Sequence, residues 1–189
     1  YISISPEELR KNIVMVPQTV TIFTGTIREN LLIANPTATD EEMWQALEDA
    51  KLADWVKSLP EGIDTQVGDA GGKLSGGQRQ ALTLMMATFN PPELLLLDEH
   101  TAALDPGTAE KVLSLTEKIV AENKLTCMMI THNMQSALEL GNRTIMMNNG
   151  RIIMDTSGEE RKALTVPDLL QKFKEEAGRD LDNDRMLLI

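Results

Sequence analysis

The stretch that decides how this chain folds is LSGGQRQ, residues 74–80, and an apolar run follows it at once. Ser75 is suited to cap the N-terminus of a helix, and Gln78 three residues later completes a capping box. The two glycines between them each cost about 1 kcal/mol against alanine in a helix. Their use is access, because bare backbone N–H groups at a helix N-terminus can approach an anion closely and the helix dipole favours negative charge there. The plain alternative is an ordinary capped helix with a flexible start.

Apolar runs on both sides of this helix predict strands of a sheet. They are residues 12–17, 94–97 and 125–131. The four leucines of the middle run are typical of a strand buried on both faces of a parallel sheet, and Asp98 and Glu99 follow them. Open α/β sheets bind ligands beyond the carboxyl ends of their strands, and two adjacent carboxylates there are costly unless a cation or partner needs them. These two acids are therefore candidate site residues, whereas Gln18 after the first run is, taken alone, an ordinary strand-end residue.

Capping residues, prolines and first-turn acids predict the helices. The predicted helix starts lie at Ser5-Pro6, Thr26, Thr39-Asp40, Leu52 and Asp105-Pro106, and a further short helix is predicted at residues 134–140. Asn149-Gly150 between apolar runs predicts a β-hairpin. The tail is predicted to form a docking helix at residues 167–177, with Leu169, Leu170 and Phe173 as its apolar face.

The composition indicates a globular protein with one domain. The chain has 189 residues, of which 42% are hydrophobic and 25% are charged. Its net charge of −11 argues against nonspecific nucleic-acid binding. The single cysteine, Cys127, lies in an apolar run and indicates a reducing compartment, and no apolar run reaches the roughly 18 residues of a membrane span. Because the chain begins with Tyr1 and not with methionine, it is expected to be a fragment or a processed form.

LSGGQRQ resembles the signature motif of the ATP-binding-cassette (ABC) ATPases, and the other motifs follow the order of that family. LLLLDE at residues 94–99 is similar to the family's Walker B strand, and ALD at residues 103–105 is similar to its D-loop. Gln18 resembles the Q-loop glutamine, and His132 resembles the switch histidine. Five motifs in the right order are far more specific than one. The resemblance covers residues 1–157 and extends to the tail. It implies an α/β fold, a partial P-loop NTPase (RecA-like) sheet with an inserted α-helical ABC subdomain.

The resemblance also divides the chain and assigns roles. It implies a partial ATPase core at residues 1–25, the helical subdomain at 26–90, the rest of the core at 91–157 and a helical tail at 158–189. Glu99 is implied as the general base, with Gln18 and His132 also acting on the nucleotide, and Asp98 and Gln18 as magnesium ligands. In the family two domains dimerise head to tail, and each ATP lies between one domain's phosphate loop and the other's signature. The residues implied to contact that nucleotide are Ser75, Gly76, Gly77, Gln78 and Asp105.

One motif of the family is missing from these residues. No stretch fits the phosphate loop G-x-x-x-x-G-K-[ST], and the nearest candidate, Gly72-Lys73, lacks both the spacing and the hydroxyl. The amides and lysine of that loop supply most of the charge stabilisation for the β and γ phosphates. The chain is therefore expected to be truncated at its N-terminus, to bind ATP weakly when alone and to hydrolyse it negligibly.

The two halves of the chain resemble different branches of the family. Residues 1–80 look like exporter cassettes, whereas residues 81–189 look like stand-alone importer-type subunits for small organic solutes. The change falls at LSGGQRQ, which both branches share. A chimaeric origin, by recombination, assembly error or deliberate fusion, is therefore a hypothesis.

The function that the resemblance implies is that of the ATP-hydrolysing subunit or domain of an ABC transporter. ATP and Mg²⁺ are the implied cofactors. The implied partners are a second nucleotide-binding domain and a transmembrane subunit or domain, with no nucleic acid, at the cytoplasmic face of a bacterial membrane. Two alternatives stay open: a non-transport ABC ATPase of DNA repair or translation, and a non-enzymatic fragment that donates its signature surface to a partner. The transported substrate and the direction of transport depend on the membrane domain.

Overall fold

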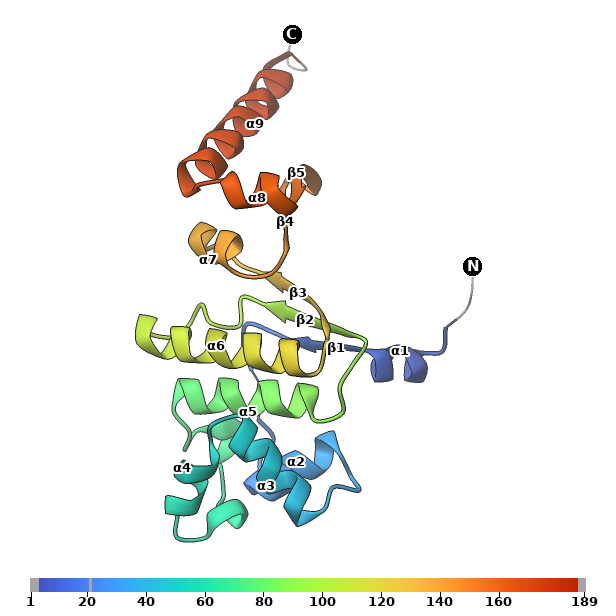
Figure 1. The fold of residues 1–189 in the computed structure, drawn as a ribbon, viewed down its shortest axis with the longest axis vertical. Coiled ribbons are helices and arrows are strands. Elements are labelled where there is room, and N and C mark those ends of the chain that lie inside the picture. The colour runs from blue at the N-terminus through green and yellow to red at the C-terminus, as the bar shows by residue number, and fades with distance from the viewer. Residues whose placement is uncertain (1–3, 21, 187–189) are drawn as a thin grey trace. The chain divides into compact units, whose positions relative to one another are not determined.

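The computed structural model describes residues 4–20 and 22–186. Contacts within the chain divide it into two compact units, residues 1–130 and 131–189. The elements of both units are labelled in Figure 1.

The first unit contains a parallel sheet of three strands in the order β1-β2-β3 (Figure 1). The strands are β1 (Ile13–Val16), β2 (Leu94–Asp98) and β3 (Thr126–Ile130). Val16 lies opposite Leu97, and Leu97 lies opposite Met129. The three predicted strands are confirmed, and their parallel register places their carboxyl ends at one edge of the sheet.

The two faces of this sheet differ in how well they are covered. Leu95 and Leu97 are 0% and 1% exposed and belong to the same core cluster as side chains of α6 (Pro106–Glu122). Leu94 and Leu96 alternate onto the opposite face and are only half-buried. That face also carries exposed apolar side chains, namely Met15, Met128 and Ile130. The prediction of a strand buried on both faces is therefore wrong for residues 94–97, because in the described part of the chain the helical core packs against one face.

Helices connect β1 to β2 and form the larger part of the first unit. After α1 (Pro6–Asn12), which precedes β1, they are α2 (Ile27–Ala34), α3 (Asp40–Asp49), α4 (Ala53–Ser58) and α5 (Gly76–Thr88), with short 3-10 turns at Gly62–Asp64 and Asp69–Gly71. The N-caps predicted at Thr26, Thr39 and Ser75 are confirmed, and each has a complete capping box. Two orphan backbone donors are satisfied at each of these helix starts.

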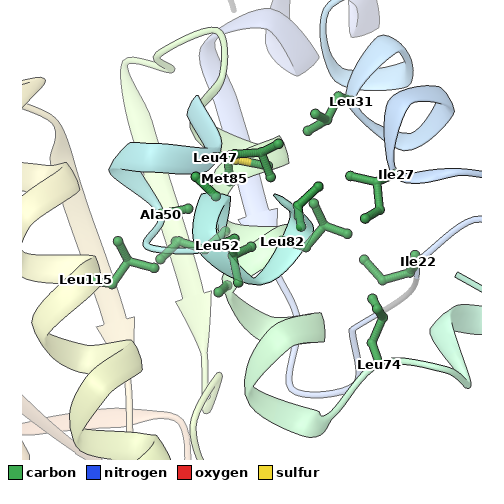
Figure 2. Close-up of a cluster of buried hydrophobic side chains, with 14 of the residues drawn as sticks. Ile22, Ile27, Leu31, Leu47, Ala50, Leu52, Leu74, Leu82, Met85 and Leu115 are labelled. Carbon is green, nitrogen blue, oxygen red and sulfur yellow. The ribbon is translucent and has the colours of Figure 1, made fainter. Parts of the chain in front are cut away.

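The core of the first unit gathers around α5. Leu82 and Met85 of this helix are 0% and 3% exposed. Figure 2 shows them among side chains from α2, α3 and the loops on either side, including Ile22, Ile27, Leu31, Leu47 and Leu74. Full burial of each such side chain contributes about 1.5–3 kcal/mol. The helix that carries the signature in its first turn is therefore held by the apolar packing of its later turns.

In its described residues, the second unit consists of a β-hairpin, two short helices and one long helix. Its elements are α7 (Met134–Glu139), β4 (Arg143–Asn148), β5 (Arg151–Ser157), α8 (Gly158–Ala163) and α9 (Val166–Met186). The predicted hairpin is confirmed, since Asn149 and Gly150 have φ of 47° and 74°, as a type I′ turn requires. The sequence did not predict α8, because GEERKA has no apolar periodicity, and α9 is longer than the predicted tail helix. Of the predicted apolar face of that helix, Leu169 is buried, whereas Leu170 and Phe173 are exposed.

Candidate functional site

The ends of β1 and β2 bring together two candidate residues that are 81 positions apart in the sequence. Gln18 Nε2 donates a hydrogen bond of 3.2 Å to Glu99 Oε2. The sheet register explains this approach, because Val16 and Leu97 lie opposite each other and the chain leaves both strands at the same edge. The strand-end glutamine therefore contacts the carboxylate that the sequence marked as a candidate base.

Glu99 has a backbone conformation that side chains other than glycine rarely adopt. Its φ is 46°, in the left-handed region, which costs a non-glycine residue roughly 1–2 kcal/mol. Its N–H donates to the carbonyl of Ile130 at 3.0 Å, and its carbonyl accepts from the N–H of Ala102 at 2.9 Å. These bonds hold a tight turn that leads the chain away from β2 while the Glu99 carboxylate stays beside Gln18.

The oxygen atoms at this edge suit a hard cation. Asp98, the last residue of β2, is half-buried. Because Gln18 donates through Nε2 to Glu99, its Oε1 is the side-chain atom left to act as a ligand. Among the residues that the structure describes, no group of three or more His, Cys, Asp or Glu side chains could hold a metal. A carboxylate and an amide oxygen fit an ion that takes most of its ligands from water and phosphate, as Mg²⁺ does.

The signature forms the first turn of α5. Ser75 Oγ accepts from the backbone N–H of Gln78 at 3.2 Å, and Gln78 Oε1 accepts from the N–H of Ser75 at 2.8 Å. The predicted capping box is confirmed. The Gln78 side-chain oxygen is therefore engaged within the chain, and its amide nitrogen is the end that remains for a ligand.

The two signature glycines allow a close approach inside the chain. A Cβ at Gly76 would lie 3.0 Å from Leu104 Cδ2, and a Cβ at Gly77 would lie 2.5 Å from Thr108 Cγ2. Real Cβ contacts are almost never shorter than 3.0 Å. Sequence reasoning gave these glycines one use, access for an anion. The structure adds a second use, which is the packing of α5 against Leu104 and the first turn of α6.

Asp105 caps α6 beside this contact. Its Oδ1 accepts from the N–H of Thr108 at 3.0 Å, so the predicted N-cap is confirmed. Hydrogen bonds from the side chain and backbone of Thr108 lower the pKa of Asp105. A groove of about 800 Å³ next to the contact is lined by Gly77, Gln78 and Thr108, among others. The proposed interface roles of Asp105 and the signature residues stay predictions.

The two histidines have different surroundings. His132 is exposed and belongs to the second unit, and its role at the nucleotide stays a prediction. His100 is 3% exposed, and burial lowers its pKa to about 4. Its Nε2 lies 3.1 Å from Thr116 Oγ1 in α6. Sequence reasoning assigned His100 no role, and no pattern indicates this contact, because the turn between β2 and α6 creates it.

Comparison with known proteins shows which family the chain belongs to. The family model for ABC transporters matches residues 3–102, more than half of the chain. The chain belongs to the ABC transporter family. The resemblance inferred from the motifs is thereby confirmed. This ABC transporter chain is 50% identical over 101 residues to the tyrosine transport ATP-binding protein of Clostridioides difficile (strain R20291), covering 53% of the chain and 40% of that protein.

Exporters are also among the relatives of this ABC transporter chain. Proteins named for multidrug export as ATP-binding/permease proteins in Staphylococcus aureus strains, such as NCTC 8325, are 37% identical over 145 residues, 77% of the chain and 25% of their own length. A solved structure of a bacterial Atm1-family ABC exporter with ATP bound matches 94% of the chain and 30% of its own chain, with a TM-score of 0.74 and 29% identity. The predicted α/β fold class is confirmed. The chain spans less than half the length of each of these proteins.

The ABC transporter chain has no candidate membrane span in its described part. None of the helices there combines the length and the apolar character that crossing a bilayer requires. The S. aureus relatives, by their names, combine ATP-binding and permease parts.

Proposed function

We propose that this chain forms part of the ATP-hydrolysing domain of an ABC transporter, in which ATP hydrolysis drives solute transport across a membrane. The observation that carries the proposal is the hydrogen bond of 3.2 Å between Gln18 and Glu99 at the carboxyl edge of the parallel sheet. A carboxylate held at this edge by an amide is placed where open α/β sheets bind their ligands.

Each candidate catalytic or metal-binding residue has a proposed role. Glu99 accepts a proton from the attacking water as general base, and Gln18 orients the carboxylate that does so. Asp98 and the Gln18 side-chain oxygen hold Mg²⁺, and the bound ion neutralises charge on the phosphate oxygens. His132 contacts the γ-phosphate. Residues 26–90 act as the helical subdomain between the two parts of the core.

The signature residues face a second copy of the domain in the proposed dimer. Ser75, Gly76, Gly77, Gln78 and Asp105 contact a nucleotide that the partner domain binds. The adjacent N-termini of α5 and α6 support this role, because helix N-termini favour negative charge. A transmembrane subunit or domain is the further partner, which places the chain at the cytoplasmic face of the membrane. The net charge of −11 supports a protein partner over nucleic acid.

A second candidate function is donation of the signature surface without catalysis by this chain. It is favoured by the lack of a G-x-x-x-x-G-K-[ST] stretch within these 189 residues. The chain alone is expected to show no measurable Mg-ATP binding by calorimetry. Binding in the micromolar range would contradict this expectation.

The proposal is tested by ATP hydrolysis in a chain extended with the upstream phosphate-loop segment of an exporter relative. Glu99→Gln is expected to lower kcat by roughly 10²–10⁴-fold, the contribution of a general base. Glu93→Gln is the matched control, because it removes the same charge next to the opposite end of β2, where Glu93 is exposed. Equal rates for Glu99→Gln and Glu93→Gln would refute the assignment. If the extended chain hydrolyses no ATP with Glu99 intact, the donor function is favoured.

A further inference from the structure

His100 is a buried polar side chain directly after Glu99. Its Nε2 lies 3.1 Å from Thr116 Oγ1, and Thr116 Oγ1 in turn donates to the carbonyl of Val112 at 2.8 Å. A threonine hydroxyl has one hydrogen to donate. Because Thr116 donates it to Val112, the hydroxyl can only accept from His100. The imidazole therefore carries its hydrogen on Nε2.

This hydrogen bond anchors the turn that contains Glu99. Within residues 99–104, His100 is the buried residue, whereas Ala102 and Ala103 are exposed. Backbone bonds within the turn, from Ala102 to Glu99 at 2.9 Å and from Leu104 to Thr101 at 3.1 Å, keep it compact. These backbone bonds do not connect the turn to α6. The His100 side chain does, because its partner Thr116 lies in the third turn of α6.

We infer that His100 is a positioning residue for Glu99. Its Nε2–H bond to Thr116 holds the turn on α6 and so keeps the left-handed Glu99 backbone and the Gln18–Glu99 contact in place. Glu99 and His100 are adjacent in the chain, so fixing the His100 side chain on α6 limits the backbone conformations open to Glu99. The importance of this for catalysis rests on the proposed function, whereas the positioning itself is a property of this chain.

The first test uses the unmodified protein at neutral pH. Nuclear magnetic resonance of the ¹⁵N-labelled chain distinguishes the two imidazole tautomers, and it also resolves the Gln18 side-chain amide. The expected result is the tautomer with hydrogen on Nε2. Hydrogen on Nδ1 instead would overturn the inference without any variant.

The second test breaks the bond from the helix side. Thr116→Val removes the acceptor, and it is expected to speed amide exchange at Ala102 and Leu104 about tenfold, since a buried donor loses its partner. The Gln18 side-chain amide signal is expected to move toward its position in Glu99→Ala, which lacks the acceptor of the Gln18 hydrogen bond. Thr116→Ser, which keeps the hydroxyl, is expected to restore both readouts.

Thr88→Val is the matched control for a loss of stability alone. Thr88 is also a buried helical threonine that donates to the carbonyl four residues earlier, Leu84, at 2.9 Å. Its replacement is expected to leave the tautomer and the Gln18 signal unchanged. If Thr116→Val leaves the Gln18 signal unchanged, or Thr88→Val moves it equally, the inference is wrong.

Two substitutions at His100 test the same hydrogen bond if Thr116→Val does not fold. His100→Gln can still donate to Thr116, whereas His100→Leu cannot. The Gln18 signal is expected to persist in the first and move in the second, and equal behaviour of the two would overturn the inference. None of these measurements requires ATP hydrolysis, so they test the positioning role of His100 independently of the proposed catalytic role of Glu99.

Discussion

Replacing Gly77 by alanine is expected to destabilise the protein, although alanine is normally the better helix residue. The new Cβ would lie 2.5 Å from Thr108 Cγ2. Ordinary carbon contacts are about 3.5–4.0 Å, so one group must move by about 1 Å or more. Thr108 resists turning away, because its β-branched side chain is stiff at χ1 and its hydroxyl is hydrogen-bonded to Asp105.

The magnitude follows from two opposing terms. Alanine gains at most about 1 kcal/mol over glycine from helix propensity, and less in a first turn. Forcing an extra methyl group into a packed contact costs typically about 1–3 kcal/mol. The overpacking term is the larger one, so the free energy of unfolding of Gly77→Ala is expected to fall by about 1–2 kcal/mol.

Urea unfolding measures this change, and the chain offers a close control. Gly107 holds the same second position in α6, but a Cβ there would meet Asp105 Oδ1 at an ordinary 3.7 Å. Gly107→Ala is therefore expected to stabilise the protein by up to about 1 kcal/mol. Thr108→Ser removes Cγ2 and keeps the hydroxyl, and Gly77→Ala should no longer destabilise in that background. Steric overlap at Gly77 is ruled out if Gly77→Ala stabilises the protein as Gly107→Ala does. It is also ruled out if Gly77→Ala lowers the free energy of unfolding equally with and without Thr108→Ser.

Three further predictions concern single side chains, each measured by urea unfolding. Asn30 is 0% exposed, and its side-chain amide donates to the carbonyls of Phe23 and Thr26. Asn30→Asp would set a carboxylate against these carbonyls and is expected to lower the free energy of unfolding by about 2–4 kcal/mol. A decrease below about 1 kcal/mol would contradict the assigned hydrogen bonds. The pKa of His100 is lowered from 6.5 to about 4, so the unfolded chain binds a proton below about pH 6.5 while the native protein does so only below about pH 4. The free energy of unfolding should therefore decrease as the pH falls through this window, by at most about 3 kcal/mol, and a pH-independent difference between the unmodified protein and His100→Gln would argue against it. Gly150 has a φ of 74°, and a Cβ added there would meet open space. Gly150→Ala is expected to lower the free energy of unfolding by about 1–2 kcal/mol from backbone strain alone. An unchanged free energy of unfolding would mean that the turn is not of type I′.

The local structure of this chain was predicted well because its signals are local. The capping residues Thr26, Thr39 and Ser75 each satisfy backbone donors within three residues of themselves. The Asn149-Gly150 turn depends on two residues that tolerate positive φ. The helix α8 was missed because its six residues carry neither an apolar stripe nor a side-chain cap. Motif order led to the ABC transporter family, since each motif is recognisable from its own few residues.

The candidate site was predicted as a set of residues and not as an arrangement. The order of the motifs already identified Gln18, Asp98 and Glu99 as members of it. The contact between Gln18 and Glu99 spans 81 residues and exists because β1 and β2 pair in parallel with a particular register. Sequence patterns specify strands, but the register between strands depends on how side chains pack after the chain has folded.

The sequence by itself determined the family, most of the helices and strands, and a set of candidate site residues whose roles stay predictions. Only the tertiary structure decided three things: that the signature glycines pack against Leu104 and Thr108, that His100 is buried against Thr116, and that one sheet face is left with exposed apolar side chains. The physical reason is the same in each case. Capping, turn formation and periodicity act between neighbours in the chain, whereas steric fit and burial are set by residues that meet only when distant segments come together.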